Sequence, residues 1–96
     1  MNTADAIRLL AESKPMLAER FGVKDLALFG STARGSAGAA SDVDVLVAFD
    51  GPATSARYFG VQFYLEDLMG CAVDQVTDKA LRPELRPFVE REAIHV

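Results

Sequence analysis

Two aspartates and an arginine stand in residues 26–49, a stretch otherwise rich in Gly, Ser, Ala and Val. Asp42 and Asp44 flank a single valine at the start of an apolar run, Val43–Phe49. In a strand, side chains two residues apart share one face, so these carboxylates should point the same way. Adjacent carboxylates repel each other, and a divalent cation such as Mg²⁺ relieves the repulsion while taking further ligands from a substrate phosphate. We therefore expect a cation site at Asp42 and Asp44.

The residues before the aspartates have the properties of a phosphate-binding turn. Gly30, Gly35 and Gly38 allow a close approach of backbone to ligand, and a helical turn beginning near Ser31 would present free amides to an anion. Arg34 adds a forked donor that suits phosphate oxygens. The segment is neither a P-loop nor a GxGxxG fingerprint. The alternative is a glycine-rich hairpin whose first aspartate only caps or bridges the chain.

Three short runs predict the strands that position these groups. Leu26–Phe29 and Val43–Phe49 are apolar and bounded by turn residues, as expected of buried strands. A third run, residues 71–77, carries one carboxylate, Asp74, beside valines. Acidic residues are depleted in strands, so Asp74 requires an explanation, and the simplest is an edge strand with this side chain in water.

Apolar periodicity predicts helices on both sides of this unit. Residues 4–21 should form one helix kinked at Pro15, or two short ones with Ser13 capping the second, and Gly22 should end it. In the tail, Pro87 should kink or delay an amphipathic helix. The apolar side of that tail helix is expected to comprise Leu81, Leu85, Phe88 and Val89.

A middle helix should begin at Thr54 or Ser55 and end near Met69. Its expected core stripe comprises Tyr58, Val61, Leu65, Leu68 and Met69. Phe59 and Phe63 lie roughly 120–160° from the centre of that stripe at about 100° per residue. An outward aromatic residue on a small domain favours a contact with a second copy or a partner, so Phe59 and Phe63 predict a homo-oligomer or partner surface.

Composition limits the class of protein. The 96 residues should form a single domain, 1–96, and half of them are hydrophobic, which predicts an ordered fold. The net charge of −4 and the absence of a basic stripe argue against direct nucleic-acid binding. Cys71 is the only cysteine, which excludes an internal disulfide framework. Without an evident signal peptide or a run of about 20 apolar residues, we expect a soluble, cytoplasmic protein that does not enter membranes.

The order of these groups carries a family resemblance. Gly30-Ser31, ten intervening residues and then Asp42-Val43-Asp44 resemble the signature of the DNA polymerase β-like nucleotidyltransferase superfamily. The fuller strings GSTARG and SDVDVLV are similar to its stand-alone minimal members, the MNT domains, and the flanks LAERFGVKDLALFGS and YLEDLMGCAVDQVT also fit. The resemblance implies the α/β (α+β) nucleotidyltransferase fold, a small mixed sheet flanked by helices.

The same resemblance implies the chemistry of the site. Asp42, Asp44 and Asp74 would be the catalytic residues and would hold Mg²⁺. The resembled proteins carry a third carboxylate at the place of Asp74 with a hydrophobic residue after it, where this chain has Gln75. Two metals held about 3.5–4 Å apart clamp the attacking and leaving oxygens of such a transfer. ATP would be the substrate, with its phosphates bound by the nucleotide-binding residues Gly30, Ser31 and Arg34.

The resemblance also implies a partner. MNT domains commonly pair with HEPN-domain toxins and act as antitoxins by transferring AMP to a toxin tyrosine. A domain of this size leaves little room for an acceptor pocket, which agrees with a macromolecular acceptor. Two alternatives remain open: an antitoxin that works by binding alone with an idle site, and a nucleotide-binding subunit of a small-molecule nucleotidyltransferase.

Overall fold

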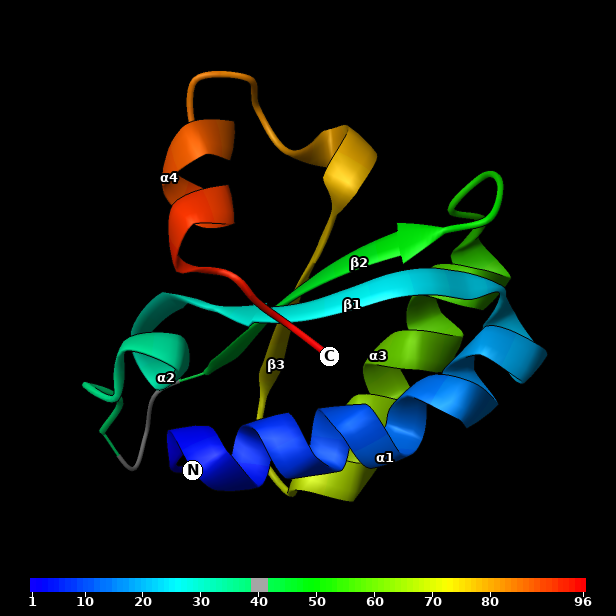
Figure 1. The fold of residues 1–96 in the computed structure, drawn as a ribbon. Coiled ribbons are helices and arrows are strands. Elements are labelled where there is room, and N and C mark those ends of the chain that lie inside the picture. Colours follow the sequence, from blue (N-terminus) through cyan, green and yellow to red (C-terminus); the bar gives the residue numbers. More distant parts are fainter. Residues whose placement is uncertain (39–41) are drawn as a thin grey trace.

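The fold, seen in a computed structural model that describes residues 1–38 and 42–96, is a four-stranded mixed sheet with helices on both faces (Figure 1). The elements in chain order are α1 Thr3–Phe21, β1 Val23–Phe29, α2 Gly30–Arg34, β2 Val43–Phe49, α3 Ser55–Met69, β3 Val73–Thr77, the 3₁₀ turn η1 Asp78–Ala80, α4 Arg86–Glu92 and β4 Ile94–His95. The strand order is β3-β2-β1-β4; β2 runs parallel to β3, and the other neighbours are antiparallel. This arrangement confirms the expected α/β (α+β) class.

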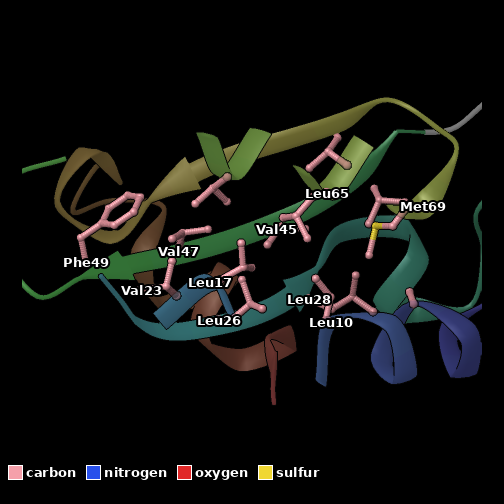
Figure 2. Packing of buried hydrophobic residues seen from close by; sticks show 14 residues of the cluster. Leu10, Leu17, Val23, Leu26, Leu28, Val45, Val47, Phe49, Leu65 and Met69 are labelled. Atoms are coloured by element: carbon pink, nitrogen blue, oxygen red, sulfur yellow. The ribbon is translucent and has the colours of Figure 1, made fainter. Parts of the chain in front are cut away.

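Helices α1 and α3 lie together on one face of the sheet and bury the main core there (Figures 1 and 2). Alternate residues of the two central strands point into it, among them Leu26 and Leu28 from β1 and Val45 and Val47 from β2. The helices contribute further fully buried leucines, of which Leu10 and Leu65 are examples. Burying a side chain of this size contributes about 1.5–3 kcal/mol, so this face holds most of the stability.

The opposite face is covered by the chain after β3, and its core is smaller. Ala27 and Leu46 point to this side and pack with Leu81, while Val76 and Val89 are only partly buried against them. Figure 1 shows α4 on this side, away from α1 and α3. Helix α4 has no buried residue, so the tail covers this face loosely.

The first helix is continuous, which corrects the expectation of a second cap. Ser13 is buried and donates to the carbonyl of Leu10, so it does not begin a new helix, and Pro15 is accommodated inside α1. The cap is Asn2, whose side chain accepts from the amide of Asp5. Gly22 ends the helix with a left-handed φ of 71°, as predicted.

The middle helix agrees closely with its prediction. Thr54 caps it by accepting from the amide of Arg57. The buried stripe is narrower than expected, because Tyr58 and Leu68 are only partly buried beside Val61, Leu65 and Met69. Phe59 and Phe63 are 51% and 63% exposed, which confirms their outward position. Their rings stack with centroids 6.1 Å apart.

The tail departs most from the sequence prediction. The helix is delayed to Arg86 with Pro87 in its first turn, but Leu85 and Phe88 are 47% and 63% exposed and do not face a core. The last residues form an unexpected strand, β4, against β1. Within residues 1–38 and 42–96, no helix combines the length and apolarity that crossing a bilayer requires. The expected cytoplasmic location stays a prediction.

Candidate active site

The site begins where two parallel strands each present an aspartate. Asp44 on β2 and Asp74 on β3 are direct register partners. Because Val43 and Val73 are buried in the main core, the alternation of the strands places both aspartates on the face that α4 partly covers. Asp42 is exposed and comes directly before β2, whose bounds, Val43–Phe49, are those that the sequence predicted. The expectation that Asp42 shares the face of Asp44 stays a prediction.

The electrostatics of Asp44 are those of a crowded carboxylate. Burial raises the pKa of Asp44, and the adjacent carboxylate of Asp74, which also shares a hydrogen bond with it, raises this pKa further. The charge of Asp42 acts in the same direction, whereas the guanidinium of Arg34 lowers the pKa. Asp74 and Asp42 therefore both act on Asp44, and Arg34 lies close enough to compensate part of this repulsion.

A glycine is required where β1 passes into α2. Gly30 has φ +72°, in the left-handed region that other residues avoid. A β-carbon at this position would also overlap Oδ2 of Asp44. The backbone of the Gly-Ser turn thus passes directly against the carboxylate, and any side chain would displace it. The contact between Gly30 and Asp44 thus accounts for the position of the Gly-Ser turn relative to Asp44.

The residue that the sequence did not reveal is Glu92 on α4. Its Oε1 and Oε2 each accept from Nη1 of Arg34 at 2.9 Å, and Oε1 also accepts from the amide of Gly30 at 3.1 Å. Glu92 and Arg34 are 58 residues apart, so no local pattern could have paired them. The structure brings the predicted phosphate ligands Gly30 and Arg34 together, but around a carboxylate of the same chain.

The other predicted phosphate ligands are placed less centrally. Ser31 is partly exposed in the first turn of α2, and its carbonyl accepts from the amide of Ser36 at 3.0 Å. Gly35 ends α2 with φ 76°. Gly35 and Gly38 line a cavity of about 230 Å³ together with Thr32 and the first residues of the chain. Residues 39–41, which complete the connection to Asp42, lie outside the described residues.

Gln75 follows Asp74 where a hydrophobic residue was expected, and its surroundings explain how it is accommodated. It is buried on the α3 side of the sheet. Its side-chain amide donates to the carbonyl of Tyr58 at 3.0 Å and to the side chain of Gln62 at 3.2 Å. The substitution therefore affects the core face and leaves Asp74 on the other.

The adjacent pair Asp44 and Asp74 fits a divalent cation. Mg²⁺ is usually held by one or two carboxylates and completes its shell with water and substrate phosphates. A cation would also offset the repulsion from Asp74 and Asp42, which adds to burial in raising the pKa of Asp44. Over the part of the chain that the structure describes, no group of three or more Asp, Glu, His or Cys side chains is arranged to hold a metal. The catalytic and metal-binding roles of Asp42, Asp44 and Asp74 stay predictions. Those of the adjacent pair Asp44 and Asp74 are better supported than that of Asp42.

Comparison with known sequences gives the family. Residues 10–96 match the model of the nucleotidyltransferase domain. The protein adenylyltransferase MntA of Thermococcus cleftensis is 39% identical over 88 residues, covering 92% of this chain and 89% of the relative. A protein of Methanocaldococcus jannaschii, assigned as a protein adenylyltransferase, is 36% identical over 98 residues and covers both chains fully.

Comparison with solved structures agrees. A structure described as a minimal nucleotidyltransferase is 39% identical, with a TM-score of 0.82 over 98% of this chain and 95% of the other. A toxin–antitoxin structure with AMP-PNP matches with a TM-score of 0.70 at 21% identity, covering 99% of this chain and 72% of the other. A tri-AMPylated Shewanella oneidensis HEPN toxin in complex with MNT antitoxin matches with a TM-score of 0.61 at 19% identity, covering 98% and 67%. These last two share the fold. The chain belongs to the nucleotidyltransferase domain family and is one of its minimal nucleotidyltransferases.

Proposed function

We propose that this nucleotidyltransferase moves AMP from ATP to a tyrosine hydroxyl of a partner HEPN-type toxin, in the presence of Mg²⁺, and thereby acts as its antitoxin. The names of its relatives support transfer to a protein. The complex of an MNT antitoxin with an AMPylated HEPN toxin, which shares the fold, supports the class of partner. The observation that carries the proposal is the carboxylate pair Asp44 and Asp74 beside the Gly30 turn.

The transfer requires one bond to form and one to break. The acceptor oxygen attacks the α-phosphorus of ATP, the bond from that phosphorus to the bridging oxygen of the β-phosphate breaks, and pyrophosphate leaves. Mg²⁺, when bound, would neutralise phosphate charge and stabilise the oxygens that gain charge. Asp44 is the more buried carboxylate and would orient the reacting phosphate through the cation. Asp74 is exposed and can take the proton of the acceptor hydroxyl.

The leaving phosphates need donors on the same side of the sheet. Arg34 supplies a guanidinium near Asp44, and Gly30, whose backbone lies against that carboxylate, supplies an amide. Hydrogen bonds donated to a phosphate that gains negative charge in the transition state are stronger than hydrogen bonds between neutral groups. Together with Ser31 they form the proposed pocket for the β- and γ-phosphates.

The exposed pair Phe59 and Phe63 gives the proposed contact surface. These two stacked rings lie on α3 away from the main core, and no other aromatic side chain of the described residues is both exposed and stacked. Burial of each ring would contribute about 1.5–3 kcal/mol of stabilisation, which is lost while the rings stay in water. We assign this surface to contact with the toxin or with a second copy of the chain.

The test is a transfer assay with a purified HEPN-type toxin. ATP labelled at the α-phosphate should label the toxin, and ATP labelled at the γ-phosphate should not. Asp44→Asn and Asp74→Asn should each abolish the label, whereas Asp25→Asn, which changes an exposed aspartate of β1, should leave it intact.

Other outcomes of this assay identify the alternatives. A tight complex without label would indicate an antitoxin that acts by binding alone, an alternative favoured by the ion pair that already occupies Arg34. Label that accumulates on a small molecule would indicate a subunit of a small-molecule nucleotidyltransferase. Either result would overturn the proposed transfer to protein.

A further inference from the structure

Glu92 occupies the donors that the nucleotide's phosphates would need. Its carboxylate accepts from the Gly30 amide and, through both oxygens, from Nη1 of Arg34. A backbone amide carries a single hydrogen, so the Gly30 amide that serves Glu92 is not free to serve a phosphate. Nη1 of Arg34 is likewise engaged by this carboxylate, because both of its bonds to Glu92 come from that one nitrogen.

The chemistry of the contact is that of an anion mimic. Arginine binds carboxylate and phosphate through the same forked geometry, and backbone amides bind both. Glu92 makes these contacts although the aspartate pair nearby is itself negatively charged. A triphosphate has more charge and more acceptor oxygens than one carboxylate, so it can outcompete Glu92 for the same groups.

The contact is also built to open. The side chains of Arg34 and Glu92 are 53% and 32% exposed, and ion pairs this open to water are weak. Helix α4 contributes no buried residue to the fold. It is held by partly buried contacts of Val89 and by a hydrogen bond from Arg86 to the carbonyl of Asp78 at 2.7 Å. The Glu92 side chain can therefore swing away without loss of the main core.

We propose that Glu92 is an internal competitor of the nucleotide: it closes the phosphate pocket in the free protein and leaves when the triphosphate binds. This inference rests on the proposed function, because it concerns the same pocket. Its consequence is linkage. A partner that draws α4 away from α2 removes Glu92 from the phosphate pocket and so raises the affinity for nucleotide. Because such coupling is reciprocal, bound nucleotide in turn releases the Glu92 end of α4.

The test is a calorimetric titration of the full chain with AMP-PNP and Mg²⁺. Glu92→Gln removes the charge that holds Arg34, so affinity should rise about three- to tenfold. Glu90→Gln is the matched control, because it removes the same charge from the same helix at an exposed pair with Arg86. It should change the affinity by less than about twofold. Equal gains in the two variants would show a general charge effect and overturn the inference.

Two further variants separate competition from other causes. Glu92→Asp keeps the charge but shortens the reach, so it should also bind AMP-PNP more tightly than the wild type, and it serves if Glu92→Gln does not fold. In an Arg34→Ala background, Glu92→Gln should lose most of its gain, because the shared donor is gone. A gain of full size in that background would overturn the inference.

These measurements also distinguish failure of this inference from failure of the proposed function. If the wild type binds AMP-PNP and Glu92→Gln and Glu92→Asp bind it equally well or less well, the inference is wrong and the proposed function stands. If neither the wild type nor any variant binds AMP-PNP with Mg²⁺, the proposed function fails and the inference fails with it.

Discussion

The two faces of the sheet are built from the same strands but differ in almost every property. The face under α1 and α3 holds a continuous apolar cluster with many fully buried side chains. The face toward α4 holds a small apolar cluster, the Asp44 and Asp74 pair, and an ion pair that is open to water. Alternation along β2 and β3 assigns successive residues to the two roles. Stability and the proposed chemistry therefore lie on opposite faces of the sheet, so a substitution should be able to remove either one without the other.

The largest expected effect is a loss of stability caused by a substitution on the face under α1 and α3. Leu28→Ala should lower the free energy of unfolding by about 2–5 kcal/mol, because it leaves a cavity where Leu28 is fully buried. Leu85→Ala is the matched control on the other side, since Leu85 is 47% exposed, and it should cost less than about 1 kcal/mol. Urea denaturation measures both. Comparable losses in the two variants would contradict the assignment of stability to one face.

The second prediction breaks the chemical face. Asp44→Asn should reduce nucleotidyl transfer by about 10²–10³-fold, equivalent to the several kcal/mol that metal-assisted charge stabilisation supplies. The same variant should melt at an unchanged or higher temperature without metal, because it removes a charge that burial and the neighbouring carboxylates disfavour, the two causes that raise the pKa of Asp44. If Asp44→Asn unfolds the protein, the pair is structural and the site loses its centre.

The third prediction sharpens the same contrast with pH. A carboxyl whose pKa is raised by folding binds more protons in the folded state than in the unfolded one, so its contribution to stability falls as pH rises. In EDTA, Asp44→Asn should therefore become more stable relative to the wild type as the pH rises. The difference in free energy of unfolding should grow from near pH 3.8, the usual pKa of this carboxyl, to a pH above the raised pKa of Asp44. Below that window the gain should vanish. A difference that is independent of pH, measured by urea denaturation across the window, would argue against the crowded carboxylate.

How far the sequence could predict this architecture depends on how local each feature is. Neighbouring residues alone predict the Gly30 turn, the strand with Asp44, the cap at Thr54 and the helix end at Gly22, and the structure has all four. The alternation that sends valines to one face and aspartates to the other is equally local. These features locate the site.

Features that need distant residues were not predictable from local patterns. The pairing of Glu92 with Arg34 and the added strand β4 both depend on where the tail returns over the sheet. The exposure of Leu85 and Phe88 has the same cause, because a helix with an apolar side buries it only where a neighbouring surface is free.

The smallest expected effect concerns α3. Phe63→Glu should change the monomer's free energy of unfolding by less than about 1 kcal/mol, the range of one exposed aromatic pair, because Phe63 stacks only on Phe59 outside the core. It should instead weaken self-association or binding to the toxin, as sedimentation and pull-down would measure. A large loss of thermal stability in a monomeric protein would show that this side of α3 belongs to the stable face.

In the proposed mechanism, the carboxylate pair Asp44 and Asp74 needs a cation to accept a triphosphate. Without one, Asp44, Asp74 and the phosphates repel one another, and without nucleotide a cation has too few ligands on this chain. The direct measurement is a titration of the wild type with AMP-PNP in Mg²⁺ and again in EDTA. We predict that the affinity for AMP-PNP collapses in EDTA and that Asp44→Asn reduces this dependence on metal. Equal affinity with and without Mg²⁺ in the wild type would contradict it.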